Sequence, residues 1–242
     1  MPYYGYGYGY GGYGLAYSWT YLLVLAGVIV CLIASAKVRS TYNRYSSVRS
    51  MSGMTGAQAA QRILAHAGIR DVQIQHVSGN LTDHYDPREK VLRLSDSVYG
   101  SDSVAAVGVA AHECGHAIQH QRGYVPLRVR GAFVPVANFG SSIAWPLIII
   151  GLMMRGQIII EIGIICFSFA VIFQLITLPV EFNASGRAMR ILRETGILNS
   201  QELPMTGRVL RAAAMTYVAS AASAILQLLR LIILYGGRSR NE

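Results

Sequence analysis

Four long apolar stretches divide the chain and predict helices that cross a membrane. They cover residues 15–36, 133–153, 158–178 and 212–235. Each offers about the 20 apolar residues that a helix needs to span a hydrocarbon core of ~30 Å. The last stretch also contains polar residues, among them Gln227 and Arg230, so the pattern leaves open whether it crosses the membrane or is re-entrant. The pattern as a whole predicts a mainly α-helical membrane protein.

A more polar segment, residues 37–132, separates the first two stretches and predicts a small α+β domain. Thr55 precedes a helical pattern that ends near His66, as a helix cap would. Short alternating segments at 72–77, 81–85 and 90–95 are bounded by turn residues and predict strands. We expect a short antiparallel sheet, followed by a helix that begins near Ser103.

The remaining segments lie at the chain ends and after the third apolar stretch. Residues 1–14 are a Tyr-Gly repeat with no regular pattern, which predicts a disordered tail. Residues 179–211 follow the third stretch and predict a helix that ends at Gly196 and a second, short helix at 201–211. Residues 236–242 form a short polar C-terminal tail.

Composition supports the membrane interpretation. Of 242 residues, 52% are hydrophobic and only 14% are charged, whereas soluble domains carry about a quarter charged residues. The net charge is +9, but no dense basic run or aromatic–basic interleaving is present, so nucleic acid is not an expected partner.

Basic residues instead flank the apolar stretches on one predicted side. Because cytoplasmic loops are enriched in Lys and Arg, this distribution predicts an external N-terminus and a polar domain on the cytoplasmic side of the plasma membrane. These basic residues are Lys37, Arg39, Arg44, Arg49, Arg122, Arg128, Arg130, Arg187, Arg190 and Arg193.

The strongest chemical signal is His-Glu-x-x-His at residues 112–116, within a helical pattern. His112 and His116 are four residues apart and so lie on one face of a helix, where they can share a zinc ion. Glu113 is placed to act as general base toward a zinc-activated water, which is the chemistry of peptide hydrolysis. Cys114, two residues after His112, points away from that face and is not expected to be a ligand.

A two-histidine zinc site needs a third protein ligand. Glu181 is the candidate, at the start of the helix predicted after Pro179. Ser185 lies one turn further on the same face, where its hydroxyl can hydrogen-bond a ligand histidine. An acid at a helix start is also favourable with the helix dipole alone, so spacing leaves the structural interpretation open.

Four segments of the chain resemble the bacterial membrane-bound neutral zinc metallopeptidases of the YugP type, which are similar to the HtpX and CAAX prenyl endopeptidase zincins. The resemblance runs from about residue 55 to 217 and implies a gluzincin-type catalytic domain, with zinc at His112, His116 and Glu181 and with Glu113 as general base. Relatives in the wider group usually have Asp where this chain has Ser185, so the expected hold on the histidine is weaker. The segments are 81–87, 91–95, 110–119 and 181–185.

Residue type alone suggests further site residues. His84, Arg187 and Tyr217 are candidates for stabilising the oxyanion of the tetrahedral intermediate. The strand that contains Val91, Leu92, Arg93 and Leu94 directly precedes the helix with the histidines. We expect this strand to be the sheet edge to which an extended substrate adds, although a purely structural strand fits the pattern nearly as well.

These observations predict a membrane-embedded zinc endopeptidase that acts on membrane or unfolded proteins at the cytoplasmic membrane surface. The expected partners are the lipid bilayer and protein or peptide substrates, and the sequence leaves open a regulatory membrane protein or a homo-oligomer. The alternative is a non-enzymatic, zinc-containing membrane scaffold that acts by binding partners. Glu113 favours the enzyme, because a structural zinc site needs no carboxylate beside its ligand.

Overall fold

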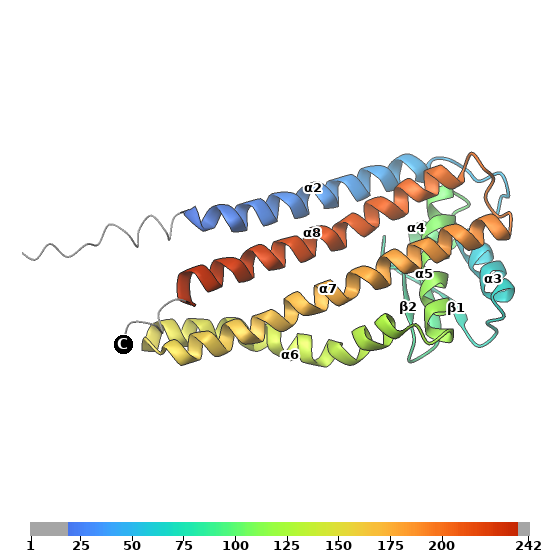
Figure 1. Cartoon of the computed structure of the whole chain (residues 1–242). Coiled ribbons are helices and arrows are strands. Elements are labelled where there is room, and N and C mark those ends of the chain that lie inside the picture. Colours follow the sequence, from blue (N-terminus) through green and yellow to red (C-terminus); the bar gives the residue numbers. More distant parts are fainter. Residues whose placement is uncertain (1–18, 237–242) are drawn as a thin grey trace, which may run out of the picture.

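A bundle of four long helices carries a small domain at one end (Figure 1). The computed structural model describes residues 19–236, and within that range the long helices are α2 (Tyr21–Ser46), α6 (Val125–Met154), α7 (Gln157–Glu194) and α8 (Leu203–Tyr235). Each is long and apolar enough to cross a membrane. Within residues 19–236 the four predicted apolar stretches are thus confirmed as helices. The predicted tail at residues 1–14 lies outside the described residues, as do all but the first residue of the tail predicted at 236–242.

The long helices pack as two antiparallel pairs joined through one contact. Helix α2 runs along α8, α6 runs along α7, and α7 also packs against α8. Glycines set the close approach within the pairs: a Cβ built at Gly27 would lie 2.7 Å from the Ser223 hydroxyl, and one at Gly163 would lie 2.7 Å from Ile148. Small residues at such crossings allow the backbone contacts that hold membrane helices together.

Helix α7 differs from the sequence prediction because it does not end at Pro179. The expected break between residues 178 and 179 is absent, and Glu181 lies inside one 38-residue helix rather than at a helix start. Proline removes one backbone donor, but helices packed among neighbours tolerate this loss. Here α7 is held by α5, α6 and α8 along its length.

Helix α8 is also longer than predicted. The separate short helix expected near residues 201–211 and the apolar stretch 212–235 form one continuous helix. No re-entrant turn interrupts it between Leu203 and Tyr235. Arg230, which made the crossing uncertain, lies near the end of the bundle away from the domain, where its guanidinium stacks over the ring of Tyr21.

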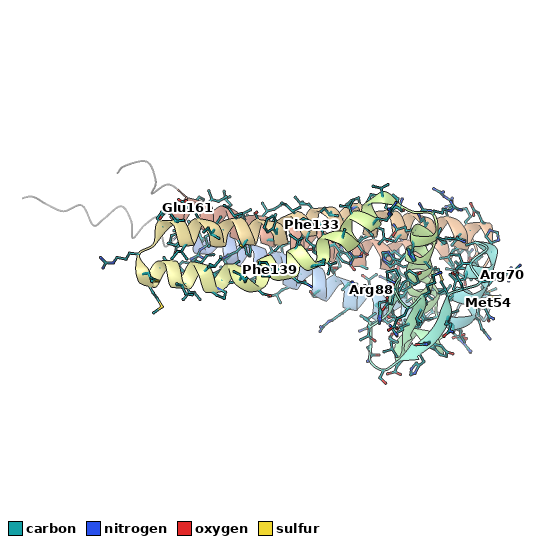
Figure 2. The ribbon with its side chains drawn as sticks, turned by 90° about the horizontal axis from the view of Figure 1, so that it is seen from below. Met54, Arg70, Arg88, Phe133, Phe139 and Glu161 are labelled. Atoms are coloured by element: carbon teal, nitrogen blue, oxygen red, sulfur yellow. The ribbon has the colours of Figure 1, made fainter. Side chains whose placement is uncertain are left out.

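The small domain contains three further helices and a three-stranded sheet. The helices are α3 (Gly56–His66), α4 (Asp96–Tyr99) and α5 (Val104–Gln121). Thr55 caps α3 in a capping box with Gln58, and the Ser103 hydroxyl caps α5 by accepting from the Ala106 amide at 3.1 Å. Figure 2 shows Met54, Arg70 and Arg88 at this domain end and Glu161 at the opposite end of the bundle.

The sheet is mixed rather than antiparallel throughout. Its strands are β1 (Gln73–Val77), β2 (His84–Asp86) and β3 (Val91–Ser95), in the order β1-β3-β2. Strand β3 pairs parallel with β1 and antiparallel with β2. The prediction that Val91–Leu94 form a free edge is therefore wrong: β3 is the central strand, paired with β1 along its length and with β2 at residues 91–93. The edge toward the bundle is β2.

Helix α5 lies at the centre of the domain and is buried on nearly all sides. It packs against α3, α7 and α8, and this explains its run of alanine, glycine and valine residues. Gly115 marks its closest approach, since a Cβ there would lie 2.6 Å from the Ala184 carbonyl oxygen of α7. This contact brings the His-Glu-x-x-His segment directly against the middle of α7.

Candidate metal centre

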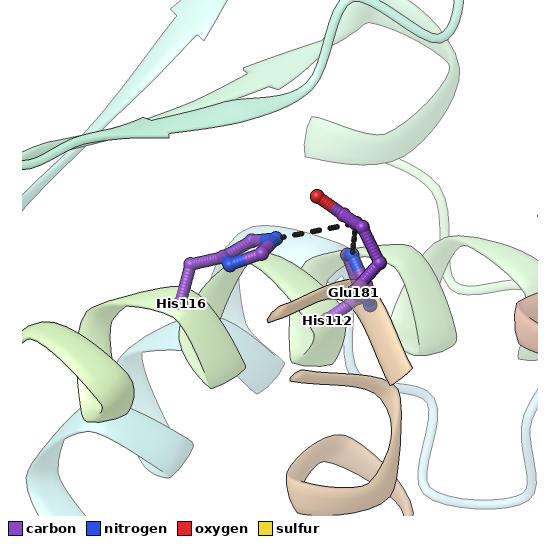
Figure 3. A group of neighbouring side chains, drawn as sticks. All are labelled: His112, His116 and Glu181. Atoms are coloured by element: carbon purple, nitrogen blue, oxygen red, sulfur yellow. Dashed lines mark hydrogen bonds and ion pairs between the residues drawn. The ribbon is translucent and has the colours of Figure 1, made fainter. Parts of the chain in front are cut away.

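Three side chains from two helices converge where α5 crosses α7 (Figure 3). His112 and His116 project from one face of α5, and Glu181 projects toward them from α7. Glu181 Oε2 lies 3.3 Å from His112 Nε2 and 3.6 Å from His116 Nε2. One potential ligand atom from each residue falls within 4.8 Å of the others.

The separations of both histidines from Glu181 suit a tetrahedral zinc ion. Zinc bonds of about 2.0–2.1 Å to nitrogen and oxygen place neighbouring ligand atoms about 3.3 Å apart in a tetrahedron. The two separations to Glu181 match that value within a few tenths of an ångström, while the cluster as a whole spans up to 4.8 Å. The donor set, two imidazoles and one carboxylate, is the type found in catalytic zinc sites, which keep a fourth position open.

The ring nitrogen of His112 that faces away from the centre, Nδ1, also has a hydrogen-bond partner. Ser185 Oγ lies 3.2 Å from His112 Nδ1, as the one-turn spacing from Glu181 predicts. When Nε2 faces a metal, Nδ1–H donates to that hydroxyl. The hydroxyl is a neutral acceptor, so it supports the ring less strongly than a carboxylate would.

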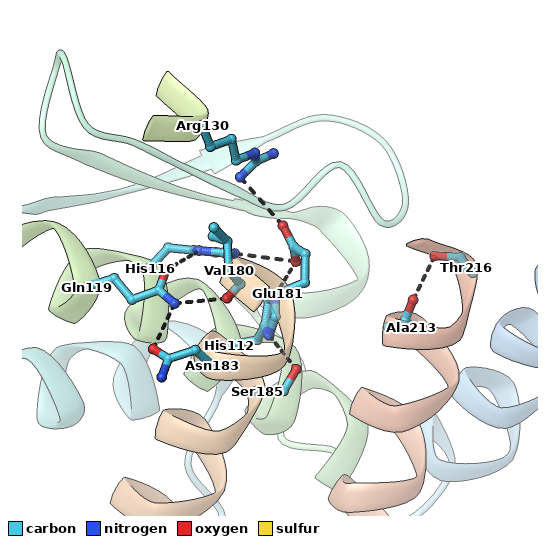
Figure 4. Close-up of polar contacts among 10 residues, drawn as sticks. All are labelled: His112, His116, Gln119, Arg130, Val180, Glu181, Asn183, Ser185, Ala213 and Thr216. Atoms are coloured by element: carbon cyan, nitrogen blue, oxygen red, sulfur yellow. Dashed lines mark hydrogen bonds and ion pairs between the residues drawn. The ribbon is translucent and has the colours of Figure 1, made fainter. Parts of the chain in front are cut away.

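Gln119 performs the same task for His116 and was not foreseen from the sequence (Figure 4). Its Nε2 donates to the Val180 carbonyl oxygen at 2.8 Å and to Asn183 Oδ1 at 3.0 Å, which leaves Oε1 to accept. His116 Nδ1 lies 3.1 Å from that Oε1 and must be the donor. The network therefore fixes the tautomer of His116 and turns the lone pair of Nε2 toward Glu181.

The carboxylates of Glu113 and Glu181 make the centre favourable for a bound cation. Burial lowers the pKa of His116, but hydrogen bonding to Glu181 and the charges of Glu113 and Glu181 outweigh it, so the pKa lies above its ordinary value. Arg130 Nη1 approaches the other oxygen of Glu181, Oε1, at 3.5 Å. This pairing leaves Oε2 as the oxygen that faces both histidines.

The centre opens into a cavity of about 990 Å³ between the sheet and the start of α6. Glu113 is 8% exposed and lines this cavity together with the three clustered residues. The walls come from strand β2 and its flanks on one side and from residues 125–134 of α6 on the other. The cleft is thus large enough for an extended peptide segment beside the metal centre.

The structure separates the three oxyanion candidates. Tyr217 of α8 and His84 of β2 both line the cavity, whereas Arg187 is absent from its described lining. Arg187 instead donates from Nε to Asn183 Oδ1 at 2.7 Å and stacks over Tyr124. His84 Nδ1 is engaged with the Thr82 carbonyl oxygen at 2.9 Å. Tyr217 is therefore the candidate placed beside the cluster.

Two residues close to the motif, Cys114 and His120, lie away from the metal centre and have structural contacts. Cys114 is fully buried on the opposite face of α5, where its thiol approaches the Ala60 carbonyl oxygen at 3.7 Å, in agreement with its exclusion as a ligand. Burial raises the pKa of this thiol well above its ordinary value. His120 hydrogen-bonds through Nδ1 to the Tyr85 hydroxyl at 2.8 Å, on the cavity wall rather than at the centre.

The roles of Gln119 and Arg130 at the centre were not predicted from the sequence. Gln119 follows His116 by three residues and so shares its helix face, a signal that could have identified it. Arg130 carried none, because its approach to Glu181 depends on how α6 folds back over α5.

A bundle of apolar helices with a His-Glu-x-x-His helix and a fitting third carboxylate defines a membrane protein with a zinc-peptidase type of centre. The comparisons with known proteins agree. A family described as "Putative neutral zinc metallopeptidase" matches residues 20–236. The chain belongs to this family of zinc peptidases.

A curated relative shares most of its length with this chain. The "Putative membrane protease YugP" of Bacillus subtilis (strain 168) is 47% identical over 221 residues, which cover 90% of this chain and 98% of that protein. No solved structure matches the chain significantly.

Proposed function

We propose that the protein is a zinc endopeptidase that cleaves membrane or unfolded proteins at the cytoplasmic surface of the plasma membrane. The observation that carries the proposal is the position of Glu113. This carboxylate lines the same cavity as His112, His116 and Glu181, next to the first ligand in the chain. A purely structural zinc site has no need of an acid that faces an open cleft.

His112, His116 and Glu181 hold the zinc in this proposal. A zinc ion in such a site supplies Lewis acidity, which lowers the pKa of a water molecule and polarises the scissile carbonyl. Glu113 then accepts a proton from the attacking water and passes it to the leaving amine. The Tyr217 hydroxyl donates to the oxygen on which negative charge develops.

Strand β2 provides the edge on which the substrate lies. One side of β2 pairs with β3, and residues on both flanks, Asp83 and Arg88 among them, line the cavity. An extended peptide that adds to this free edge would run alongside the metal centre. The substrate-binding edge that the sequence analysis assigned to β3 is therefore assigned to β2 in this proposal.

Charge distribution supports the cytoplasmic orientation. The helix ends next to the domain carry Lys37 of α2, Arg128 of α6 and Arg208 of α8, with many further arginines, whereas the opposite ends carry Arg155 and Arg230 among the described residues. Cytoplasmic ends of membrane helices have this excess of positive charge. With four crossings, residue 236 would then lie outside the cell, and a reporter fused there reads the orientation directly.

The test uses full-length protein purified in detergent, with unfolded casein as substrate and bound zinc measured by elemental analysis. We expect the wild type to cleave casein and Glu113→Gln to retain zinc while cleavage falls by at least 10³-fold, on the order seen for loss of an essential acid–base group. Equal cleavage by both proteins would exclude Glu113 as the base. Zinc in both with cleavage by neither, also in liposomes, would favour the scaffold alternative.

A further inference from the structure

A second, smaller cavity lies on the other side of the metal centre. It has a volume of about 270 Å³ and is lined by helices α2, α5, α7 and α8 and by Leu81 and Asp83, which precede β2. Five residues of its wall also line the large cleft, so the two cavities meet at the metal centre: Asp83, His112, Glu113, Glu181 and Tyr217. A side chain of a bound peptide can therefore enter the small cavity next to the metal centre.

The lining beyond these shared residues is mostly apolar. Aliphatic side chains from three helices form it: Val38, Val109, Val209, Leu210, Ala213 and Ala214. Figure 4 shows Ala213 of α8 on the far side of the space that begins at His112 and Ser185. Two small alanines on α8 leave the room that larger residues would fill.

Apart from Tyr217, the hydroxyl groups of the lining already have partners. Tyr42 donates to the Ser97 carbonyl oxygen at 2.9 Å, Thr216 donates to the Ala213 carbonyl oxygen at 2.6 Å, and Ser185 is engaged with His112. Among the residues that line this cavity, none is a lysine or arginine. Beyond Tyr217 and the metal centre, an acidic group that entered would lose its hydration without gaining a hydrogen-bond donor from these hydroxyl groups, which costs free energy.

The volume limits the size of the occupant. An apolar protein cavity of about 150 Å³ holds a benzene molecule. A cavity of 270 Å³ can therefore accept the side chain of leucine, methionine or phenylalanine.

We propose that this cavity is the specificity pocket of the site, and that it binds an aliphatic or aromatic side chain next to the scissile bond of the substrate. This inference rests on the proposed peptidase function, because the large cleft supplies the peptide whose side chain turns into the pocket. Helix α2, which contributes Val38 and Tyr42, thereby forms part of the substrate site.

The first measurement is kcat/KM for peptides that differ only at one residue beside the cleaved bond, which is Ala, Leu, Phe or Glu. We expect the wild type to prefer Leu or Phe over Ala by about 10-fold or more and to reject Glu, since hydrophobic pockets discriminate by this order per missing group. Ala213→Leu fills the pocket and should abolish the preference while the Ala peptide is still cleaved. Ala224→Leu, three turns along the same face of α8 and in neither cavity wall, should keep it.

Val38→Ala gives the reciprocal test with little risk to folding, since Val38 is only partly buried. It enlarges the pocket and should shift the preference from Leu toward Phe. The pocket assignment is overturned if Ala213→Leu reduces cleavage of all four peptides by the same factor and Val38→Ala leaves their ranking unchanged.

A binding experiment tests the pocket independently of the proposed peptidase activity. Glycine, leucine and phenylalanine hydroxamates, which chelate zinc, are titrated into zinc-loaded protein by calorimetry. We expect about 10-fold tighter binding of the leucine than of the glycine compound, lost in Ala213→Leu and kept in Ala224→Leu. That result without peptide cleavage would overturn the peptidase proposal and leave the pocket standing as a ligand site. Equal binding of all three compounds would overturn the pocket.

Discussion

The side-chain amide of Gln119 donates to the carbonyl oxygen of Val180 at 2.8 Å, and this bond joins α5 to α7 beside Glu181. The same amide group orients His116. One buried residue therefore sets the relative position of ligands that are 65 residues apart in the chain, His116 and Glu181.

Replacing Gln119 should weaken zinc binding. Gln119→Leu removes the acceptor of His116 Nδ1 and leaves the Val180 carbonyl oxygen without this donor, so we expect a 10- to 100-fold loss of zinc affinity and about 1–3 kcal/mol of stability. Competition with a fluorescent chelator measures the affinity. Gln121→Leu, exposed two residues further along α5, is the control and should bind zinc as the wild type does.

The contact at Gly115 should be equally sensitive to size. A methyl group there would meet the Ala184 carbonyl oxygen at 2.6 Å, so Gly115→Ala must push α5 from α7 and separate the histidines from Glu181. We expect a loss of about 1–3 kcal/mol in stability and reduced zinc content. Gly186→Ala, on α7 with open space around it, should change neither. A zinc-replete, wild-type-like Gly115→Ala protein would show that the helices do not touch here.

Tyr217→Phe should reduce catalysis without affecting the metal. Loss of one oxyanion donor lowers kcat by about 10²- to 10³-fold, and KM and zinc content should remain near their wild-type values. The measurement is steady-state kinetics on the best peptide substrate. The parallel variant Arg187→Gln acts on the Asn183 network outside the cavity, so a larger kcat effect there would reverse the assignment.

Cys114 should resist alkylation in the folded protein. Burial raises the pKa of its thiol, so at pH 8 the thiolate fraction is smaller than for an exposed cysteine, and the sulfur is also inaccessible. In a background with Cys31→Ser and Cys166→Ser, we expect no maleimide labelling in an hour until denaturant is added. Rapid labelling of native protein, measured by mass spectrometry, would contradict the buried position.

Local patterns in the sequence were sufficient for much of this architecture. Apolar length identified the helices, and the four-residue spacing placed His112 and His116 on one face. The sequence did not reveal that Pro179 lies inside a helix, because the stabilising contacts come from distant helices. The prediction of the sheet edge was wrong for the same reason: alternation along residues 91–95 identifies a strand but not the strands that pair with it.

The continuity of α7 places Glu181 on the same helix as an apolar stretch long enough to cross a membrane. Glu181 lies 24 residues from the first residue of α7, Gln157, a distance of about 36 Å at 1.5 Å per residue. If the helix pivots at that end, a tilt of only 5° moves the carboxylate by about 3 Å, nearly the full separation between ligand atoms. Because membrane helices adjust their tilt to bilayer thickness, we expect the thickness of the surrounding lipid to act on the coordination geometry.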